Sequence, residues 1–375
     1  MTRTLKLYVL AGEPSGDRIA ADLVQRLGER VPVAVTGVGG EALAAVGLQS
    51  QFDMSELSVM GWADVLPRLP RLLRRARQVA RTIIRTRPDI VLLVDAQAFS
   101  SVVAGQVHRA APEIPVLLCV APAVWAWKPE RARRLTPRFR EVLAVLPFEP
   151  AVMRRVGGPE TTYIGHPALD AYAQRAATPQ RGPLLLLPGS REGELRRHLP
   201  LMRAIATDFA AHPRVSGFVL PTPQRLVARL QAAVADWPAE VRIVSGEEAK
   251  KAAMAAAVGA VAVTGTVTLE LALAGVPMVT TYVADKGQAK RWFKYKIEFA
   301  ALPNAILARR FVPEILQLVP DAPALSAAVA QLLDDPARTT EQLAGFVEIR
   351  QLMDTGLPDD PRTDPVSRIL AHFYR

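Results

Sequence analysis

Asp95 is the first residue whose type and position suggest chemistry. Residues 91–100 read VLLVDAQAFS, so an apolar, strand-like run ends at this carboxylate. Open parallel sheets bind ligands beyond the carboxyl ends of their strands. Asp89 precedes the same run and is expected to be structural, whereas Asp95 follows it and lies on the functional edge. We expect Asp95 to be a catalytic or ligand-binding acid, and a simple turn aspartate is the alternative.

The segment 10–24, LAGEPSGDRIAADLV, offers two further acids after the first expected strand. Its glycines permit a tight turn, and Ser15 or Asp17 can cap the helix that follows. Free backbone N–H groups at a helix N-terminus suit an anion or a polar sugar. Glu13 and Asp17 are candidate acid or base groups. The glycine spacing differs from the dinucleotide fingerprint, so no cofactor is predicted.

Residues 184–197, LLLLPGSREGELRR, place Arg191 at the mouth of a helix, directly after Gly189 and Ser190. An arginine beside free backbone donors suits a diphosphate, because it adds charge and a bidentate fork. A surface salt bridge is the alternative for Arg191.

A similar turn lies within residues 260–282. An expected strand ends at Thr264, Gly265 and Thr266, and the following helix carries Thr268 and Glu270. A helix N-terminus of this kind suits a phosphate, and Glu270 is placed to bind ribose hydroxyls. The alternative for Glu270 is an acid favoured in the first turn by the helix dipole.

The elements that must position these residues alternate along the chain, which indicates parallel sheets covered on both faces. In the first half, strands are expected at 6–11, 33–36, 90–95, 115–120, 141–145 and 162–164. Helices are expected there at 16–29, 68–86, 100–110, 130–136 and 150–156.

A linker rich in Pro, Gly and polar residues, 165–183, precedes a second alternation. Strands are expected at 184–187, 217–220, 241–244, 259–263 and 277–282. Helices are expected at 194–210, 223–236, 248–256, 267–274, 323–333, 339–352 and 365–374. The fold class is therefore α/β, with two Rossmann-like domains that face a cleft, residues 1–168 and 180–320. A helical tail, 321–375, packs back on the first domain or on a partner subunit.

The composition describes a globular chain that is long enough for two cores. It has 375 residues, of which 50% are hydrophobic and 22% are charged. The single cysteine, Cys119, excludes an internal disulfide framework and suits a reducing cytoplasm. We expect neither a signal peptide nor a membrane-spanning helix. The five histidines are scattered without metal-ligand spacing, so no metal site is predicted.

The net charge of +10 favours anionic partners. Residues 68–87 hold eight arginines and no acid, and their apolar residues recur every three or four positions. This pattern predicts an amphipathic helix that packs on the core and exposes a basic face. The same helix can lie near an anionic membrane, and the two interpretations are compatible. No nucleic-acid motif is present.

Eight motifs together resemble one family. In chain order, from residue 11 to about 310, they are AGEPSGD, ELSVMG, VWAW, LPFEP, IGHP, LLPGSR, TGTVTLELAL and LPNAILARR. Each is weak alone, but the combination is specific. The chain resembles lipid-A-disaccharide synthase, a family of bacterial glycosyltransferases with a GT-B-like fold of two domains.

The resemblance implies transfer of diacylated glucosamine from UDP-2,3-diacylglucosamine to 2,3-diacylglucosamine 1-phosphate. The new bond would be β-1,6, formed with inversion and without a metal. The resemblance also implies a peripheral enzyme at the cytoplasmic face of the inner membrane, which fits the arginine-rich helix. The family often exchanges C-terminal elements between subunits, so a homodimer is possible.

The resemblance also assigns site residues by motif. Arg191 of PGSR and the turn from Thr264 to Glu270 would hold the UDP moiety, and Asn304 and Arg309 would complete that side. Glu13, Ser15 and Asp17 would line the facing domain.

One motif departs from the family pattern at the proposed centre of the chemistry. The family usually has D-x-P-D-F, whereas this chain has DAQAF, so that Ala98 replaces the second aspartate. In the family that second acid is a leading candidate for the catalytic base. Asp95, Glu13 or Asp17 would then have to accept the proton.

Three functions are compatible with these residues. The first is an active lipid-A-disaccharide synthase with a different base. The second is a non-catalytic paralogue that binds UDP-sugar or acylated sugar at a membrane, which the loss of the acid at position 98 favours. The third is another UDP-sugar enzyme of the same fold, such as a UDP-N-acetylglucosamine epimerase. The SVMG, VWAW and LPFEP segments favour the first over the third.

Overall fold

The computed structural model describes residues 3–57 and 62–374. The chain forms two compact units. The first contains residues 1–166 and 355–375, and the second contains residues 167–354. The SVMG segment of the sequence motif, residues 58–61, lies outside the described residues.

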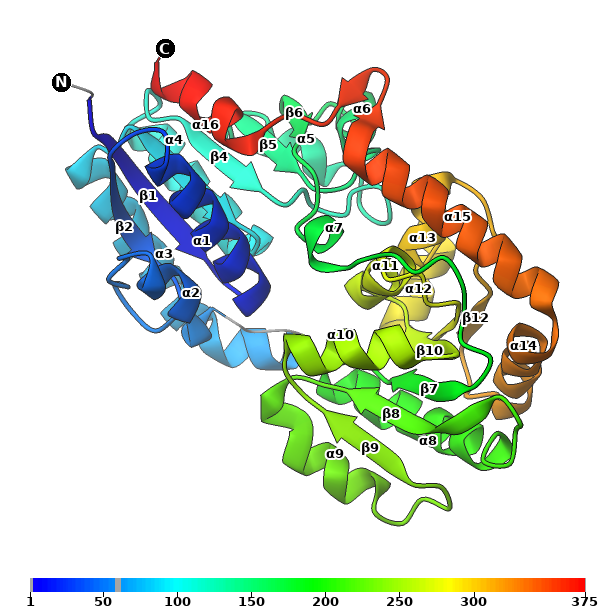
Figure 1. The fold of residues 1–375 in the computed structure, drawn as a ribbon. Coiled ribbons are helices and arrows are strands. Elements are labelled where there is room, and N and C mark those ends of the chain that lie inside the picture. Colours follow the sequence, from blue (N-terminus) through cyan, green and yellow to red (C-terminus); the bar gives the residue numbers. More distant parts are fainter. Residues whose placement is uncertain (1–2, 58–61, 375) are drawn as a thin grey trace. The chain divides into compact units, whose positions relative to one another are not determined.

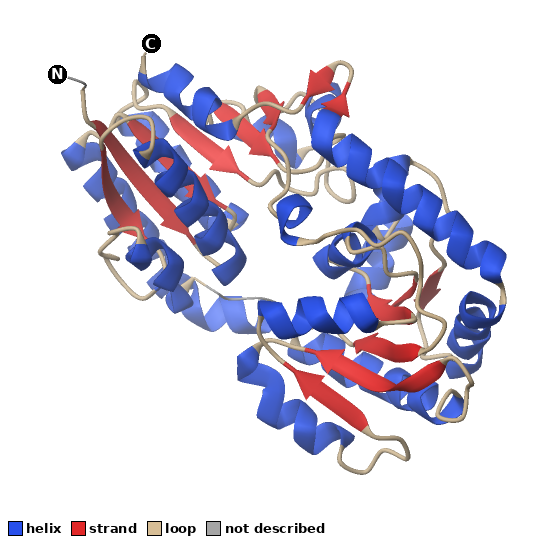
Figure 2. Ribbon diagram, viewed as in Figure 1, coloured by secondary structure: helices blue, strands red, loops and turns tan. Residues whose placement is uncertain are grey.

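The first unit is built on a parallel sheet of six strands with helices on both faces (Figures 1 and 2). Its strands are β1 (Leu5–Ala11), β2 (Val33–Val38), β3 (Ile90–Val94), β4 (Val116–Cys119), β5 (Glu141–Ala144) and β6 (Thr161–Tyr163). Its helices are α1 (Pro14–Gly28), α2 (Glu41–Ala45), α3 (Trp62–Thr86), α4 (Gln97–Ala110), α5 (Arg131–Leu135), α6 (Glu149–Arg155) and α16 (Pro365–Phe373), with a 3₁₀ turn at Met54–Glu56 and a small hairpin, β13 (Gly356–Leu357) and β14 (Asp360–Pro361).

The strand order of this sheet is β2-β1-β3-β4-β5-β6. All five residues of β3, IVLLV, are buried, because helices cover the sheet on both sides. The chain order reverses between β1 and β3. In open α/β sheets a ligand binds at this topological switch point, beyond the carboxyl ends of the strands.

The second unit contains another parallel sheet of six strands, in the order β12-β11-β10-β7-β8-β9. Its strands are β7 (Gly182–Leu187), β8 (Val215–Pro221), β9 (Val241–Val244), β10 (Gly259–Val263), β11 (Met278–Val283) and β12 (Glu314–Gln317). Its helices are α7 (Ala168–Ala171), α8 (Glu192–Asp208), α9 (Val227–Val234), α10 (Glu247–Ala256), α11 (Thr266–Leu273), α12 (Lys286–Tyr295), α13 (Leu302–Leu307), α14 (Ala322–Asp334) and α15 (Pro336–Thr355). Here the switch point lies between β7 and β10.

The last residues of the chain return to the first unit (Figure 1, red). Arg154 binds Asp360 through two hydrogen bonds of 2.5 and 2.7 Å. The fully buried Glu141 accepts from Arg368 at 2.5 Å and lies 2.6 Å from Nε2 of His372. Burial alone would raise the pKa of Glu141, but His372 and Arg368 hold this pKa below its ordinary value. The C-terminal helix therefore supplies partners, Arg368 among them as the cation, to a carboxylate in the core of the first unit.

The expected fold of two Rossmann-like domains is confirmed by these two sheets. Strands β9 and β10 have the expected bounds, and most other elements differ by one to three residues. The helix expected at 68–86 begins already at Trp62, so Pro67 and Pro70 lie within it. The helix expected at 223–236 is a 3₁₀ turn at Gln224–Leu226 followed by the shorter α9.

Candidate active site

The loops that follow β1 and β3 meet at the switch point of the first sheet. Strands β1 and β3 are paired, with Ala11 opposite Val94 at their carboxyl ends. A β-carbon built on Gly12 would lie 2.3 Å from the β-carbon of Ala96, so only glycine fits there. The structure thus brings the predicted residue Asp95 into the neighbourhood of the Gly12–Asp17 loop.

Asp95 and Ala96 both have left-handed backbone conformations, with φ of 57° and 43°. Such conformations cost non-glycine residues about 1–3 kcal/mol each and concentrate at functional sites. Hydrogen bonds hold the turn: Asp95 N donates to Cys119 O at 3.0 Å, and the hydroxyl of Ser100 donates to Asp95 O at 2.9 Å. The surrounding structure therefore fixes a strained turn at the end of β3.

Burial raises the pKa of Asp95 above its ordinary value. A carboxylate with a raised pKa is a better proton acceptor at neutral pH than an ordinary aspartate. Ala98 is exposed on the first turn of α4 and has no acidic group. Asp95 therefore has an electrostatic environment that suits a base.

Asp17 is buried and its carboxylate already has three backbone partners. It accepts from Gly40 N at 2.7 Å, from Ala42 N at 2.9 Å and from Leu43 N at 3.4 Å. These N–H groups belong to the start of α2, so Asp17 anchors that helix. The catalytic role of Asp17 stays a prediction. Its hydrogen bonds show that it stabilises the start of α2.

Glu13 and Ser15 lie at the start of α1, next to the switch point. Glu13 is the N-cap residue, with an extended backbone, and Pro14 follows it as the first helical residue. Glu13 is partly buried and Ser15 is exposed. Both side chains are thus near enough to the surface to meet a ligand.

In the second unit, the loops that follow β7 and β10 flank the switch point. The first carries Gly189, Ser190 and Arg191, and the second carries Thr264, Gly265 and Thr266. The predicted nucleotide-binding residues therefore follow the two strands between which the topology places a ligand.

The N-terminus of α8 has an internal partner, contrary to our expectation of free backbone donors there. The carboxylate of Glu194 accepts from Ser190 N at 3.1 Å and from Arg191 N at 3.2 Å. The guanidinium of Arg191 lies 3.1 Å from the same carboxylate, yet its side chain remains 57% exposed. Glu194 therefore provides a hydrogen-bond acceptor for the backbone N–H groups of Ser190 and Arg191, and the side chain of Arg191 remains accessible.

The N-terminus of α11 is more open. Gly265 has no heavy atom within 4 Å of the place where a β-carbon would lie, and Thr266 is exposed. Thr268 is buried, and its hydroxyl donates to Gly265 O at 2.8 Å and accepts from Leu302 N at 3.3 Å. Thr268 therefore shapes the turn, and the first N–H groups of α11 suit an anion.

Glu270 lies one turn into α11 and forms an ion pair with Lys250 of α10, with the nearest atoms 3.1 Å apart. Burial alone would lower the pKa of Lys250, but Glu270 raises it above its ordinary value. The ammonium group also lies 5.7 Å from the ring centre of Tyr172. Glu270 thus belongs to a charged cluster. The sequence-based alternative, an acid favoured by the helix dipole, did not include Lys250 as a partner.

Asn304 is buried and binds four backbone or side-chain atoms. Its amide nitrogen donates to Val312 O and to Glu314, both at 2.8 Å, and its oxygen accepts from Phe311 N and Val312 N. Arg309, in contrast, is exposed and pairs with Glu348. Asn304 therefore joins α13 to β12, and its predicted contact with UDP stays a prediction, as does that of Arg309.

Sequence reasoning did not single out Glu149, which is buried at the start of α6 just after β5. Its carboxylate accepts from Leu146 N at 3.0 Å and from Val145 N at 3.2 Å, and burial raises its pKa to about 8. Nearby, Trp125 and Phe148 pack edge to face with ring centres 5.5 Å apart. The LPFEP and VWAW motifs thus help to build the carboxyl edge of the first sheet.

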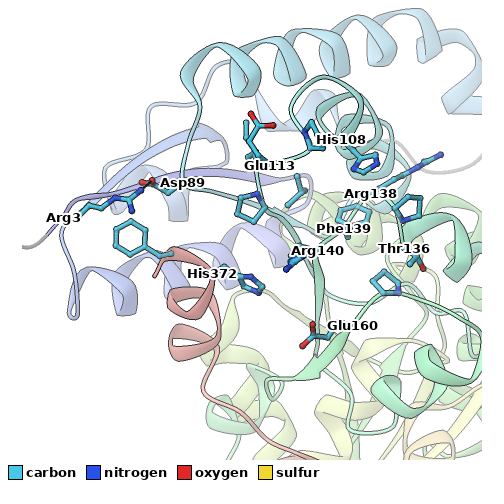
Figure 3. A pocket seen from close by; sticks show the side chains of 17 residues that line it. Arg3, Asp89, His108, Glu113, Thr136, Arg138, Phe139, Arg140, Glu160 and His372 are labelled. Carbon is cyan, nitrogen blue, oxygen red and sulfur yellow. Dashed lines mark hydrogen bonds and ion pairs between the residues drawn. The ribbon is translucent and has the colours of Figure 1, made fainter. Parts of the chain in front are cut away.

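A cavity of about 730 Å³ lies at the opposite, amino-terminal edge of that sheet (Figure 3). Arg3, Asp89, Arg140 and Glu160 are among its lining residues. No predicted site residue lines it. Among the described residues no cluster of His, Cys, Asp and Glu suits a metal ion, and no helix is long and apolar enough to cross a membrane.

Comparison with known proteins identifies the family. Residues 7–356 match the family model described as lipid-A-disaccharide synthetase. The chain belongs to this family. A lipid-A-disaccharide synthase of Rhodopseudomonas palustris strain BisB18 is 40% identical over 94% of this chain and 91% of its own length. The protein of the same name from Nitrobacter hamburgensis is 37% identical over the same shares of the two chains.

Solved structures share the fold of this family member at low sequence identity. A UDP-GlcNAc 2-epimerase from Neisseria meningitidis, bound to UDP-GlcNAc, has a TM-score of 0.63 and 12% identity over 99% of both chains. The glycosyltransferase of kitacinnamycin has a TM-score of 0.60 and 16% identity over 99% of both chains. These structural similarities support the fold, whereas the family membership rests on the match to the family model and on the similar sequences.

Proposed function

We propose that the protein is a lipid-A-disaccharide synthase. In this reaction 2,3-diacylglucosamine passes from UDP-2,3-diacylglucosamine to 2,3-diacylglucosamine 1-phosphate, with a new β-1,6 bond and inversion at the anomeric carbon. The observation that carries the proposal is the family match over residues 7–356. The candidate loops at both switch points lie within this range.

The second unit would bind the UDP-sugar. The open N-terminus of α11 and the accessible guanidinium of Arg191 supply positive potential for the diphosphate. Both stabilise the charge that develops on UDP as the bond to the sugar breaks. Glu270 is placed to accept hydrogen bonds from ribose hydroxyls while it is paired with Lys250.

The first unit would activate the acceptor. As the 6-hydroxyl of the acceptor attacks the anomeric carbon, its proton passes to a base and UDP leaves. Asp95 is our proposed base, because burial raises its pKa and its turn is held at the end of β3. Positioned base catalysis typically contributes about 10²–10⁴-fold to the rate.

We propose a peripheral location at the cytoplasmic face of an inner membrane. Helix α3 buries Ala76, Val79 and Ile83, and exposes Arg74 and Arg81. A basic helical face of this kind suits anionic lipid headgroups. The homodimer implied by the resemblance stays a prediction, which light scattering of the purified chain tests.

The test is turnover of UDP-2,3-diacylglucosamine with its monophosphate acceptor, with Asp95→Asn beside the wild type. We expect disaccharide from the wild type and a loss of about 10²-fold or more in Asp95→Asn, with unchanged binding of UDP. Asp89→Asn, on the opposite sheet edge, is the control and should retain turnover. Equal activity in Asp95→Asn would move the base to Glu13 or Asp17. No product from the wild type, with UDP still bound, would contradict the proposed function.

A further inference from the structure

The carboxyl edge of the second sheet presents exposed apolar side chains from two neighbouring loops. Phe293 of α12 is 72% exposed, and Leu318 and Val319, just after β12, are 55% and 75% exposed. Strands β11 and β12 are paired, and Ala284 N donates to Gln317 O at 2.9 Å where both strands end. The two loops therefore begin side by side, and we call them together the α12–β12 surface, residues 284–296 and 318–321.

Basic residues surround the apolar residues on α12. Residues 286–296 contain five lysines and arginines, and no acid occurs between Asp285 and Glu298. Lys290, Phe293 and Lys294 are exposed, and their spacing of three and four puts them on one helical face. Within the part of the chain that the structure describes, Lys290 and Lys294 form no ion pair, so their charge is available to a partner.

Both loops are held in place by side-chain hydrogen bonds. Asp285 accepts from Gln288 N at 2.8 Å and caps α12, and Gln288 in turn donates to the hydroxyl of Tyr282 at 2.8 Å. The side chain of Gln317 bonds to both N and O of Asp321, each at 2.9 Å. These hydrogen bonds fix the backbone of both loops. The exposed apolar residues therefore lose little conformational entropy on binding.

We propose that the α12–β12 surface docks the second unit onto an anionic lipid bilayer. An exposed Phe293 flanked by exposed lysines fits an interfacial helix, in which the ring enters the acyl boundary while the ammonium groups remain among the headgroups. Leu318 and Val319 add apolar area on the neighbouring loop. The excess of positive charge selects a negatively charged membrane as the partner.

This inference rests on the proposed function, because it explains how an enzyme with acylated substrates would reach them. It adds a second contact on the unit that would bind UDP-sugar, independent of the arginines of α3 in the first unit. The surface lies on the same sheet edge as the loops after β7 and β10. An acylated donor would thus leave the bilayer next to the loops that bind it.

The first experiment uses a single label. Cys119 is fully buried, so a thiol reagent reaches a newly introduced cysteine first. An environment-sensitive fluorophore is attached to Phe293→Cys or Val319→Cys, with Val347→Cys of α15, 57% exposed in the wild type, as the control. With vesicles of phosphatidylglycerol and phosphatidylcholine, we expect a blue shift at positions 293 and 319 and none at 347. No shift at 293 and 319, or an equal shift at 347, would overturn the proposal.

The second experiment measures how the charge of α12 affects binding to vesicles. Lys290→Glu/Lys294→Glu should lower the partition coefficient on the anionic vesicles by on the order of 10-fold or more. Lys251→Glu/Arg338→Glu makes the same change in net charge elsewhere on this unit and should have a much smaller effect. Equal losses in the two double variants would mean that only total charge matters, and would overturn the proposal.

Turnover separates this proposal from the proposed function. The same preparations are assayed with substrates dispersed in detergent micelles, where docking on a bilayer is not needed. Lys290→Glu/Lys294→Glu should turn over at the wild-type rate there. Product in micelles without the expected vesicle effects contradicts the docking surface alone, whereas no product from the wild type contradicts the proposed function.

Discussion

Gly12 and Ala96 approach so closely that a β-carbon on Gly12 would lie 2.3 Å from the β-carbon of Ala96. We expect Gly12→Ala to push the Asp95 turn out of place. Overpacking of this kind costs about 1–3 kcal/mol, and a misplaced catalytic group loses further rate. Thermal unfolding and turnover should both decline, turnover by roughly 10-fold or more. Gly28→Ala is the matched control, because no atom lies within 4 Å of its β-carbon position. A fully active Gly12→Ala enzyme would contradict the contact.

The pH dependence of turnover should report Asp95. A general base must be ionised, so the rate falls as pH falls through its pKa. Because burial raises the pKa of Asp95, the acid limb of the profile should lie above the ordinary aspartate value of 3.8. The measurement is kcat/KM between pH 4 and 8, with stability checked at each pH. The residual activity of Asp95→Asn should lack this limb, and a limb that persists unchanged would assign it to another group.

Replacing Glu270 should affect donor binding more than the chemical step. Glu270→Gln removes the charge that pairs with Lys250 and weakens an acceptor for ribose hydroxyls. Hydrogen bonds to charged groups contribute about 1.5–3 kcal/mol, so the Kd for UDP should rise by roughly 10- to 150-fold. Calorimetric titration with UDP measures this change. The exposed Glu248, which pairs with Lys251, supplies the control Glu248→Gln. An unchanged Kd in Glu270→Gln would remove Glu270 from the donor site.

Asn304 and Arg309 should differ in their effect on stability. Asn304→Ala leaves buried backbone groups of Phe311 and Val312 without partners, and should lower the free energy of unfolding by about 2–3 kcal/mol. Arg309→Ala removes an exposed ion pair and should change it by less than about 1 kcal/mol. Denaturant titration measures both. If the stability of Asn304→Ala equals that of the wild type, the hydrogen bonds of the Asn304 amide do not hold α13 to β12.

His198 should make stability depend on pH. Its Nε2 accepts from Val283 N at 2.9 Å, so Nδ1 carries the hydrogen and donates to Glu194 O. Burial lowers the pKa of His198 below 6.5. The folded state therefore favours the neutral ring, and its contribution is complete above pH 6.5 and is lost as pH falls. The slope for one group is at most about 1.4 kcal/mol per pH unit.

Unfolding titrations at pH 7.5 and 5.5 test this sign. His198→Gln should show a smaller loss of stability over that interval than the wild type. His108→Gln, at an exposed position, is the control and should keep the wild-type dependence. A dependence that is identical in His198→Gln and the wild type would assign the titration to other groups.

The sequence patterns predicted those parts of the fold that depend on local order. The apolar run 259–263 predicted its strand to the residue, and other apolar runs, such as 90–95, predicted their strands to within one or two residues. Helix α12 was not predicted, because its interspersed lysines and aromatic residues give no continuous apolar stripe. Strand β12 was missed as well, since Glu314 and Gln317 flank an apolar stretch of only two residues.

The candidate site shows a similar division. The turns after β1, β3, β7 and β10 could be found because each combines a strand end with small or charged residues. The partners of their side chains could not, because they come from distant segments: α2 for Asp17, and α10 for Glu270. Glu194 is an exception, since its place three residues after Arg191 is the spacing of a capping box and was available in the sequence.

The return of residues 355–375 to the first unit constrains how the protein is made. Residues 1–166 leave the ribosome first, but Arg368 and His372, which bind the buried Glu141, are synthesised more than two hundred residues later. Until then the nascent first unit contains a core carboxylate without its Arg368 and His372 partners. The second unit, in contrast, is contiguous in sequence and can complete its fold earlier. The first unit therefore completes its fold only after residues 355–375 have been synthesised, and chaperones have that interval in which to act.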